Sequence, residues 1–171
     1  MASPPIILNN NEQMKKITKE NRFDEAIKAL VKGYFEESLI RGSCAACAVG
    51  NIIANAMNED IIVTKGVTGS VKDYGTWKGG FNILESWFTV FGSRGMFGEQ
   101  YILESNYRGV PREQIDSTGY SYKELARVEK AFESKGEDMF TGLMAVVDVL
   151  CEIEGKSQEE AKEYKEMFVK E

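Results

Sequence analysis

Hydrophobic residues recur at helical spacing along much of this chain. The first clear stretch follows Asn21 and repeats apolar side chains every three or four positions as far as Phe35, which predicts an amphipathic helix. Asn21 belongs to the residue types that cap helices, so we expect it to cap this one. A second stretch, residues 43–57, is apolar around nearly its whole circumference. We expect a central, buried helix there, with Ser43 as its cap after Gly42 interrupts the chain.

The last third of the chain carries three helix-start signals. Two serine–glutamate pairs have the spacing of capping boxes, and one aspartate is a single cap; they are Ser121 with Glu124, Ser157 with Glu160, and Asp138. Gly155 is expected just past the end of the middle helix. The buried face of the first of these helices is marked by Leu125, Val128 and Phe132. The apolar residues carried by the other two helices are Phe140, Leu143, Met144, Val147, Leu150, Cys151, Ala161, Tyr164 and Phe168.

The middle of the chain, residues 61–118, lacks this regularity. Ile61–Thr64 has the composition of a short strand, and the glycines that follow are typical of a small hairpin or an ordered loop. Residues 82–91 are expected to form a short aromatic helix, and residues 92–118 to be irregular. The prediction is a mainly α, single-domain helical bundle of about five to six helices with an irregular insertion at 61–118. Residues 1–20 are expected to form a polar N-terminal arm, and residues 21–171 the helical domain.

Composition narrows the classes of protein that fit. The chain has 171 residues, 43% of them hydrophobic, and a net charge of −6. This composition fits one globular domain, and the charge argues against binding of polymeric nucleic acid, which needs clustered Lys and Arg. No stretch approaches the roughly 18 apolar residues of a membrane span, and the first residues do not resemble a signal peptide. Three cysteines are an odd count for a disulfide framework, so we expect a cytoplasmic protein without a membrane partner.

The chain contains no histidine, which removes the commonest general base and metal ligand. The carboxylates near the middle form no recognisable catalytic pair; they are Asp73, Glu85, Glu99, Glu104 and Asp116. Asp148 falls inside an apolar helical stretch and is expected at its polar edge, with a buried, hydrogen-bonded carboxylate as the alternative. We therefore expect no enzyme, no cofactor and no metal.

Two cysteines lie close together near the expected start of the second helix. Cys44 and Cys47 are three residues apart, so on a helix they would share one face near its positive end. One interpretation is ordinary core packing beside small residues. The alternatives are a redox or metal-binding pair, which lacks both the usual βαβ context and further ligands, and a ligand-contacting site.

The residues before this expected helix have the chemistry of an anion site. A helix start offers free backbone N–H groups, Ser43 offers a hydroxyl, and Arg41 offers a guanidinium, so the three together could hold a phosphate. The segment is not a P-loop, because the Lys-Ser/Thr ending is absent. The alternative is a surface turn with an ordinary helix cap.

The middle segment concentrates aromatic residues and glycines. Nine of the chain's 18 aromatic residues lie in residues 74–107, and eight of its 16 glycines lie in residues 66–98. Rigid rings beside flexible backbone suit a stacked, flat ligand or the anchor residue of a partner protein. The alternative is an irregular lobe that needs aromatics for its own packing. The ligand-contacting residues predicted here are Tyr74, Trp77, Trp87, Arg94, Arg108 and Arg112.

Two blocks of the chain resemble a known group of proteins. One is residues 23–51, which end in Cys44-Ala-Ala-Cys47-Ala-Val-Gly-Asn51. The other starts at Gly119-Tyr-Ser and continues in Phe140-Thr-Gly-Leu-Met-Ala-Val-Val-Asp-Val-Leu-Cys151. Together they resemble small uncharacterised proteins of Bacteroidetes and their phages, which often carry a label as a subunit of a sodium-translocating NADH-quinone reductase. Three cysteines cannot supply the four ligands of an iron–sulfur cluster, so that label does not fit this chain.

The resemblance implies a phage-associated protein but assigns no functional residues. Combined with the residues above, it leads us to expect a non-enzymatic protein that sequesters a small anionic, nucleotide-like immune signal of the host. A second hypothesis is a protein-binding accessory factor or inhibitor that docks through the aromatic lobe, on another protein or on a second copy of this chain. A third is a cysteine-dependent redox or metal protein.

Overall fold

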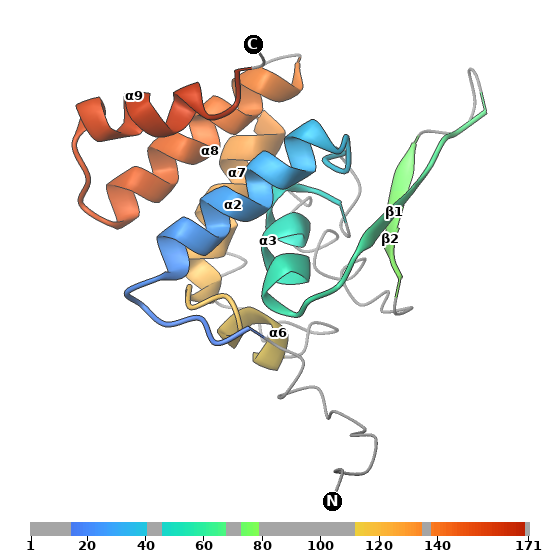
Figure 1. Ribbon diagram of the computed structural model, residues 1–171, viewed down its shortest axis with the longest axis horizontal. Coiled ribbons are helices and arrows are strands. Elements are labelled where there is room, and N and C mark those ends of the chain that lie inside the picture. Colours follow the sequence, from blue (N-terminus) through green and yellow to red (C-terminus); the bar gives the residue numbers. More distant parts are fainter. Residues whose placement is uncertain (1–14, 41–45, 68–72, 79–111, 135–137, 170–171) are drawn as a thin grey trace, which may run out of the picture.

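The computed structural model describes residues 15–40, 46–67, 73–78, 112–134 and 138–169. Within them the chain forms six helices and a two-stranded sheet (Figure 1). In chain order the elements are α2 (Arg22–Phe35), α3 (Ala48–Ala56), β1 (Ile61–Thr64), β2 (Tyr74–Trp77), α6 (Arg112–Asp116), α7 (Tyr122–Ser134), α8 (Met139–Ile153) and α9 (Gln158–Glu166). The prediction of a mainly helical fold with a small hairpin is confirmed.

The helices pack as two pairs with α9 on the outside. α7 packs along α8, and α2 packs on α3. Because α3 also contacts α7 and α2 contacts α8, the α2/α3 pair lies against the α7/α8 pair, while α9 covers α8 (Figure 1). The core forms where the pairs meet, and Leu125, Val128 and Phe132 are fully buried on α7 as predicted. Each large side chain buried in this way contributes about 1.5–3 kcal/mol of hydrophobic stabilisation.

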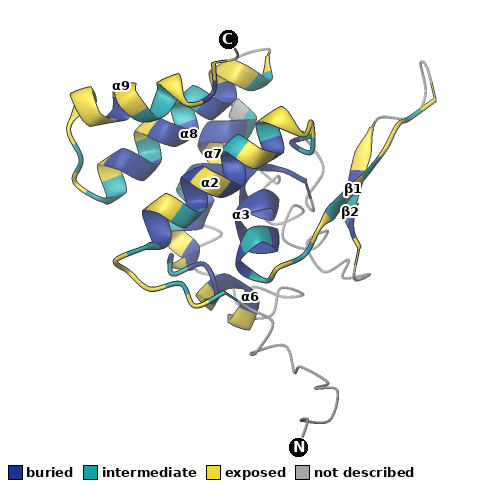
Figure 2. Cartoon of the chain, viewed as in Figure 1, coloured by how far each residue is buried: buried dark blue, intermediate teal, exposed yellow. Residues whose placement is uncertain are grey.

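The prediction that α3 is central and buried is confirmed, but its predicted start is wrong. All of its residues except Asn55 are buried (Figure 2). The helix begins at Ala48, with Cys47 and not Ser43 in the N-cap position. The Cys47 backbone is extended, and its sulfur accepts a hydrogen bond from the Gly50 N–H at 3.3 Å. Cys47 therefore lies at the cap and not within the helix, while Cys44 lies outside the described residues.

The cap signals of the last third are confirmed. In both capping boxes the serine hydroxyl accepts the glutamate N–H and the carboxylate accepts the serine N–H; the distances are 3.1 and 2.8 Å for Ser121 and Glu124, and 3.1 and 3.0 Å for Ser157 and Glu160. Asp138 accepts the N–H of Thr141 at 2.7 Å. Gly155 follows α8 with a φ of +72°, which favours glycine.

Asn21 precedes α2 but does not cap it. Its side chain instead accepts the Thr18 N–H at 2.7 Å and donates to the carbonyl of Lys16 at 3.1 Å. The reason is the backbone of Asn21, which already has α-helical angles, whereas a capping side chain needs an extended residue to reach forward into the first turn. Residues 15–20 lead into α2, and the Lys15 N–H donates to the carbonyl of Ala56 at the end of α3.

β1 and β2 form an antiparallel hairpin that projects from the helices (Figure 1). Ile61 pairs with Trp77 and Val63 with Gly75, and these four residues form the inner face of the hairpin, where Trp77 is buried. The outer face consists of Ile62, Thr64, Tyr74 and Thr76.

Two further predictions were wrong at the ends of elements. Residues 112–116 form the short helix α6 inside the region expected to be irregular. Pro111 followed by Glu113 is a helix-start signal in the sequence that explains this start. Phe168 was expected within the last helix, but it lies beyond the end of α9, where it is fully buried. The predicted helix at residues 82–91 lies outside the described residues. Among the helices that the structure describes, none has the length and apolar character needed to cross a bilayer.

Candidate functional site

A groove of about 460 Å³ lies between the end of α2, the segment that follows it, the hairpin and the start of α8. We call it the hairpin groove. Its volume falls in the range of small-molecule sites in proteins. Most of its walls are apolar, with charged groups at the hairpin and at the end of α2. Its lining residues are Gly33, Tyr34, Glu37, Leu39, Ile40, Val63, Lys65, Asp73 and Met139.

The wall formed by Leu39 and Ile40 is positioned by a sharp turn at the end of α2. The Ser38 N–H donates to the carbonyl of Gly33 at 2.8 Å, and Glu37 between them has a φ of +58°. This is a Schellman-type helix end with glutamate at the position that usually holds glycine. A non-glycine residue in this left-handed conformation costs about 1 kcal/mol.

Aromatic rings support the groove from the helix side. Tyr34 lines the groove, and its ring contacts Phe35, Phe140 and Phe168 with centroid distances of 5.3, 6.2 and 5.9 Å. Such edge and tilted contacts contribute about 0.5–1.5 kcal/mol each beyond area burial. Tyr34 is therefore packed against three other rings at the edge of the groove.

Lys65 and Asp73 form the charged rim of the groove. The Lys65 ammonium lies 3.4 Å from the Asp73 carboxylate, and the Gly66 N–H donates to the same carboxylate at 2.8 Å. The backbone hydrogen bond from Gly66, followed by the Lys65 side chain, lowers the pKa of Asp73. The Lys65 side chain is 74% exposed, so it is free to turn toward an anion in the groove.

Asn51 of α3 ties the groove wall to the start of α3. Its amide N–H groups donate to the carbonyls of Ser38, Ala46 and Cys47 at 3.0, 3.0 and 3.1 Å, and its oxygen accepts from the Ser38 hydroxyl at 3.2 Å. The Ile40 N–H also donates to the carbonyl of Ala46 at 2.8 Å. Residues 38–40 and 46–47 therefore form one hydrogen-bonded unit.

Two glycines allow the neighbouring elements to approach this unit. A Cβ on Gly33 of α2 would lie 2.5 Å from the Asn51 side-chain oxygen, and a Cβ on Gly75 of β2 would lie 2.5 Å from the Cβ of Ala46. Any larger residue would push α2 from α3, or the hairpin from the start of α3. The hairpin, α2 and α3 thus meet in close contact beside the groove.

A buried carboxyl group from α7 points at the start of α3. Glu129 is 2% exposed, and neither of its carboxyl oxygens forms a hydrogen bond of good geometry within the described part of the chain. Burial raises the pKa of Glu129 to about 8, helped by the nearby Glu133 carboxylate and opposed by the Cys47 thiol and the Val49 N–H. The group is therefore neutral at pH 7.

The predicted site residues divide into three groups. Trp77 and Cys47 are buried, at 2% and 1% exposure, and belong to the hydrophobic core. Tyr74 is 45% exposed on the outer face of the hairpin, and Arg112 is the first residue of α6. The remaining predicted residues lie outside the described residues; they are Arg41, Ser43, Cys44, Trp87, Arg94 and Arg108.

The described thiols have the surroundings of core residues. Cys47 and Cys151 are buried, and burial raises the pKa of the Cys151 thiol. Such thiols are weak nucleophiles because the thiolate is the reactive form. No group of three or more Cys, Asp or Glu side chains suited to a metal ion occurs in the described ranges.

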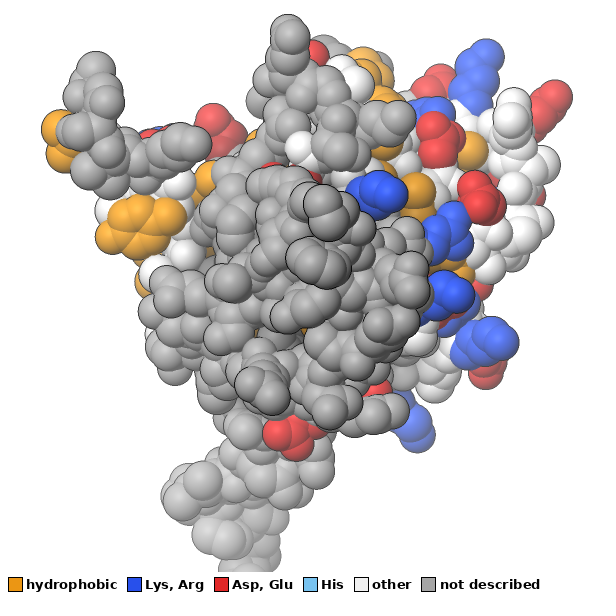
Figure 3. Space-filling view, turned by 180° about the vertical axis from the view of Figure 1, so that it is seen from behind, with side chains coloured by type: hydrophobic (Ala, Val, Ile, Leu, Met, Phe, Trp, Pro, Cys, Tyr) orange, Lys and Arg blue, Asp and Glu red, His pale blue; other side chains and the backbone are white. Residues whose placement is uncertain are grey.

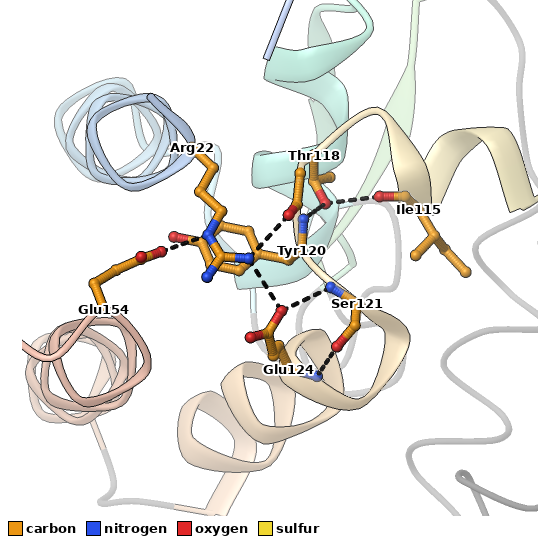
Figure 4. A network of polar contacts seen from close by, with 8 residues as sticks. Arg22, Ile115, Thr118, Tyr120, Ser121, Glu124 and Glu154 are labelled. Atoms are coloured by element: carbon orange, nitrogen blue, oxygen red, sulfur yellow. Dashed lines mark hydrogen bonds and ion pairs between the residues drawn. The ribbon is translucent and has the colours of Figure 1, made fainter. Parts of the chain in front are cut away.

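The most connected polar cluster surrounds Arg22 (Figure 4). Its guanidinium donates to Glu154 at 2.6 Å, to Glu124 at 3.2 Å and to the carbonyl of Gly119 at 2.9 Å, and it lies 4.3 Å from the ring centre of Tyr120. Burial raises the pKa of the Tyr120 hydroxyl. These groups all contact the Arg22 guanidinium, so the cluster joins α2, the start of α7 and the end of α8 and serves the fold.

Asp148, the other carboxylate singled out from the sequence, is 58% exposed. It accepts a salt bridge from Lys165 of α9 at 2.8 Å. Asp148 therefore lies at the polar edge of α8, as expected, and is not the buried carboxylate of the alternative interpretation.

The sequence analysis did not single out three residues that shape the site: Tyr34, Asn51 and Glu129. Glu129 had a usable signal, because it lies four positions after Leu125 and three before Phe132, on the buried face of α7. A carboxylate on such a face is unusual and marks a candidate. Asn51 likewise stands inside an otherwise apolar helix. For Tyr34 no local signal separates a groove wall from the core.

Comparisons with protein-family models, with curated proteins and with solved structures gave no match for this chain. The candidate site therefore rests on its geometry alone.

Proposed function

We propose that this protein is a non-enzymatic binding protein that holds a small anionic, nucleotide-like ligand in the hairpin groove. The observation that carries the proposal is the groove itself, a mainly apolar hollow of about 460 Å³ with a tyrosine in its lining and an exposed lysine at its rim. A flat base fits against a ring, and a phosphate fits an ammonium group. Binding of this kind needs enclosure and charge pairing and no acid–base chemistry.

The position of the groove along the chain also supports the proposal. Ile40 lines the groove and directly precedes Arg41, and β2 leads into the aromatic segment from which Trp87, Arg94 and Arg108 were predicted. The resemblance to phage-associated proteins suggests a biological role for such binding. In that role the protein would sequester a nucleotide immune signal of the bacterial host.

The first experiment identifies the ligand. Native mass spectrometry of the purified full chain, followed by release and analysis of small molecules, is expected to find a nucleotide-like compound at up to one per chain. Calorimetry with the emptied protein against cyclic mononucleotides, cyclic dinucleotides and ADP-ribose derivatives is expected to give binding at micromolar or tighter affinity. If neither measurement detects binding, the proposal fails.

A matched pair of variants then locates the site. Lys65→Glu reverses the charge at the rim of the groove, and we expect it to weaken binding of an anionic ligand by about tenfold, equivalent to about 1.4 kcal/mol. Lys78→Glu makes the same change at an exposed residue of the other end of the hairpin, outside the groove, and should leave affinity within about twofold. Equal effects of the two variants would place the ligand elsewhere.

A second candidate function, docking on a protein, is favoured by the outer face of the hairpin. Ile62 and Tyr74 are 48% and 45% exposed there, and Figure 3 shows hydrophobic side chains on this projecting part of the surface. Such a face suits a second copy of this chain or another protein. Light scattering tests whether the chain associates with itself. Self-association that the Ile62→Ser/Tyr74→Ser double variant loses would support docking through this face. A wild-type monomer at high concentration would exclude a second copy as the partner.

A further inference from the structure

Glu129 is difficult to explain as a residue that serves stability. A carboxyl group that is 98% buried and lacks a well-formed hydrogen bond destabilises a fold, because it loses its hydration and gains no equivalent contact. A leucine or methionine at this place on the buried face of α7 would avoid that loss. Features that reduce stability in this way often mark functional positions.

The surroundings of Glu129 indicate what it acts on. Its carboxyl group faces the first turn of α3, next to the Cys47 sulfur and the Val49 N–H. The first turn of a helix presents backbone N–H groups that lack intrahelical partners. A neutral carboxyl group can lie against these donors without the charge that would draw water into the core.

The first turn of α3 is connected to the hairpin groove by hydrogen bonds. The carbonyls of Ala46 and Cys47 are held by the Asn51 amide, which also holds Ser38. The Ile40 N–H binds Ala46 directly. Leu39 and Ile40 in turn form a wall of the groove. A displacement at Cys47 is therefore transmitted to that wall through two or three contacts.

We propose that Glu129 is a positioning residue for the hairpin groove, which holds the start of α3 and the groove wall in place only while its carboxyl group carries a proton. This inference rests on the proposed function, since it names the regulation of the same site. Protonation makes the group neutral and compatible with burial. When the proton leaves, the carboxylate requires hydration. Water can reach it at the lowest cost if the first turn of α3, which covers it, opens.

The groups that face Glu129 agree with such behaviour. On its own helix the Glu133 carboxyl group lies one turn later, and on α3 the Cys47 thiol and the Val49 N–H are its neighbours. Arg127, two residues before Glu129 on α7, forms an ion pair with Glu152 of α8 at 2.7 Å. The carboxyl of Glu133 opposes a charge on Glu129.

The main test is the pH dependence of affinity. With a pKa near 8, Glu129 is protonated in only about one tenth of the molecules at pH 9. The affinity of the wild-type full chain for the nucleotide that calorimetry identifies should therefore fall about tenfold from pH 7 to pH 9. Glu129→Gln, which stays neutral, should keep its affinity over this range. Glu133→Gln removes a negative charge that raises the pKa of Glu129. The midpoint of the affinity loss should therefore move to lower pH, and this variant should bind more weakly than the wild type at pH 8. Identical profiles for wild type and Glu129→Gln would overturn the inference.

A second measurement needs no ligand. Hydrogen–deuterium exchange is compared between wild type and Glu129→Gln at the same pH, so that intrinsic exchange rates cancel. At pH 6.5 the amides of Val49, Gly50 and Asn51 should be equally protected. At pH 9 their protection should be about tenfold lower in the wild type, while that of α9 should not differ. If no ligand binds at any pH but this difference appears, the proposed function fails and the role of Glu129 stands; equal protection at both pH values refutes that role.

Discussion

The neutral state of Glu129 makes a quantitative prediction about stability, independent of any ligand. The perturbation is Glu129→Gln, which replaces the buried carboxyl group by a neutral group of nearly the same shape. In the folded chain the pKa of Glu129 is raised to about 8 from an ordinary value of 4.5. The folded state therefore binds this proton more tightly than the unfolded state does. Below pH 4.5 both states are protonated, and stability falls as pH rises from 4.5 to 8.

The size of this loss follows from proton linkage. Each pH unit between the two pKa values removes about 1.36 kcal/mol, so the wild type loses about 1 kcal/mol by pH 5 and about 3 kcal/mol by pH 7. Glutamine does not titrate, and the fixed cost of its amide is the same at both pH values. The difference in unfolding free energy between the variant and the wild type should therefore grow by about 2–3 kcal/mol from pH 5 to pH 7.

The assay is urea unfolding of both proteins at pH 5, 6 and 7, with melting temperatures as a second measure. For a chain of this size the change corresponds to a relative gain of about 5–10 °C for the variant. Glu163→Gln on α9 is the matched control, because Glu163 is exposed, and its difference from the wild type should stay within about 0.5 kcal/mol. A difference for Glu129→Gln that does not change with pH would refute the premise that this carboxyl group is buried and neutral.

Three other variants test the contacts that build the site. Arg22→Met leaves Glu124 and Glu154 without their shared cation and should cost about 3–5 kcal/mol in urea unfolding, against less than about 1 kcal/mol for Arg127→Met at the more exposed pair; equal costs would contradict the burial argument. Gly75→Ala should cost about 1–3 kcal/mol by pushing the hairpin from Ala46, and a neutral result would mean that this contact can relax. Glu37→Gly should raise the melting temperature by relieving about 1 kcal/mol of left-handed strain, and a lower one would show that the Glu37 side chain contributes more than the strain costs.

The helical architecture could be predicted because its signals are local. Capping boxes at Ser121 and Ser157, the Asp138 cap and Gly155 each act within one turn, so their residue types determine where helices begin and end. The apolar periodicity of α2 and α7 likewise identifies the face that the core covers. The failure at Asn21 is also instructive. A residue type that can cap does so only if its own backbone is extended, and the backbone of Asn21 is already helical.

The candidate site was less accessible to sequence reasoning. The sequence drew attention to Cys47 and Trp77 by their types, yet both are buried in the core. Tyr34 and Lys65 line the groove although they belong to different elements and are separated by 31 positions, a relation that no local pattern contains. The sequence places Glu129 on the predicted buried face of α7. That the start of α3 lies against its carboxyl group is visible only in the structure.

By itself, the sequence determined the helical class of this protein, the starts of its last three helices and the buried face of α7. These depend mainly on interactions among residues a few positions apart. The tertiary structure alone decided that α3 starts at Ala48 with Cys47 as its cap, that a carboxyl group of α7 faces this start, and that the hairpin closes a groove against α2. Those features depend on how separate elements pack, and close packing makes each contact depend on all of its neighbours.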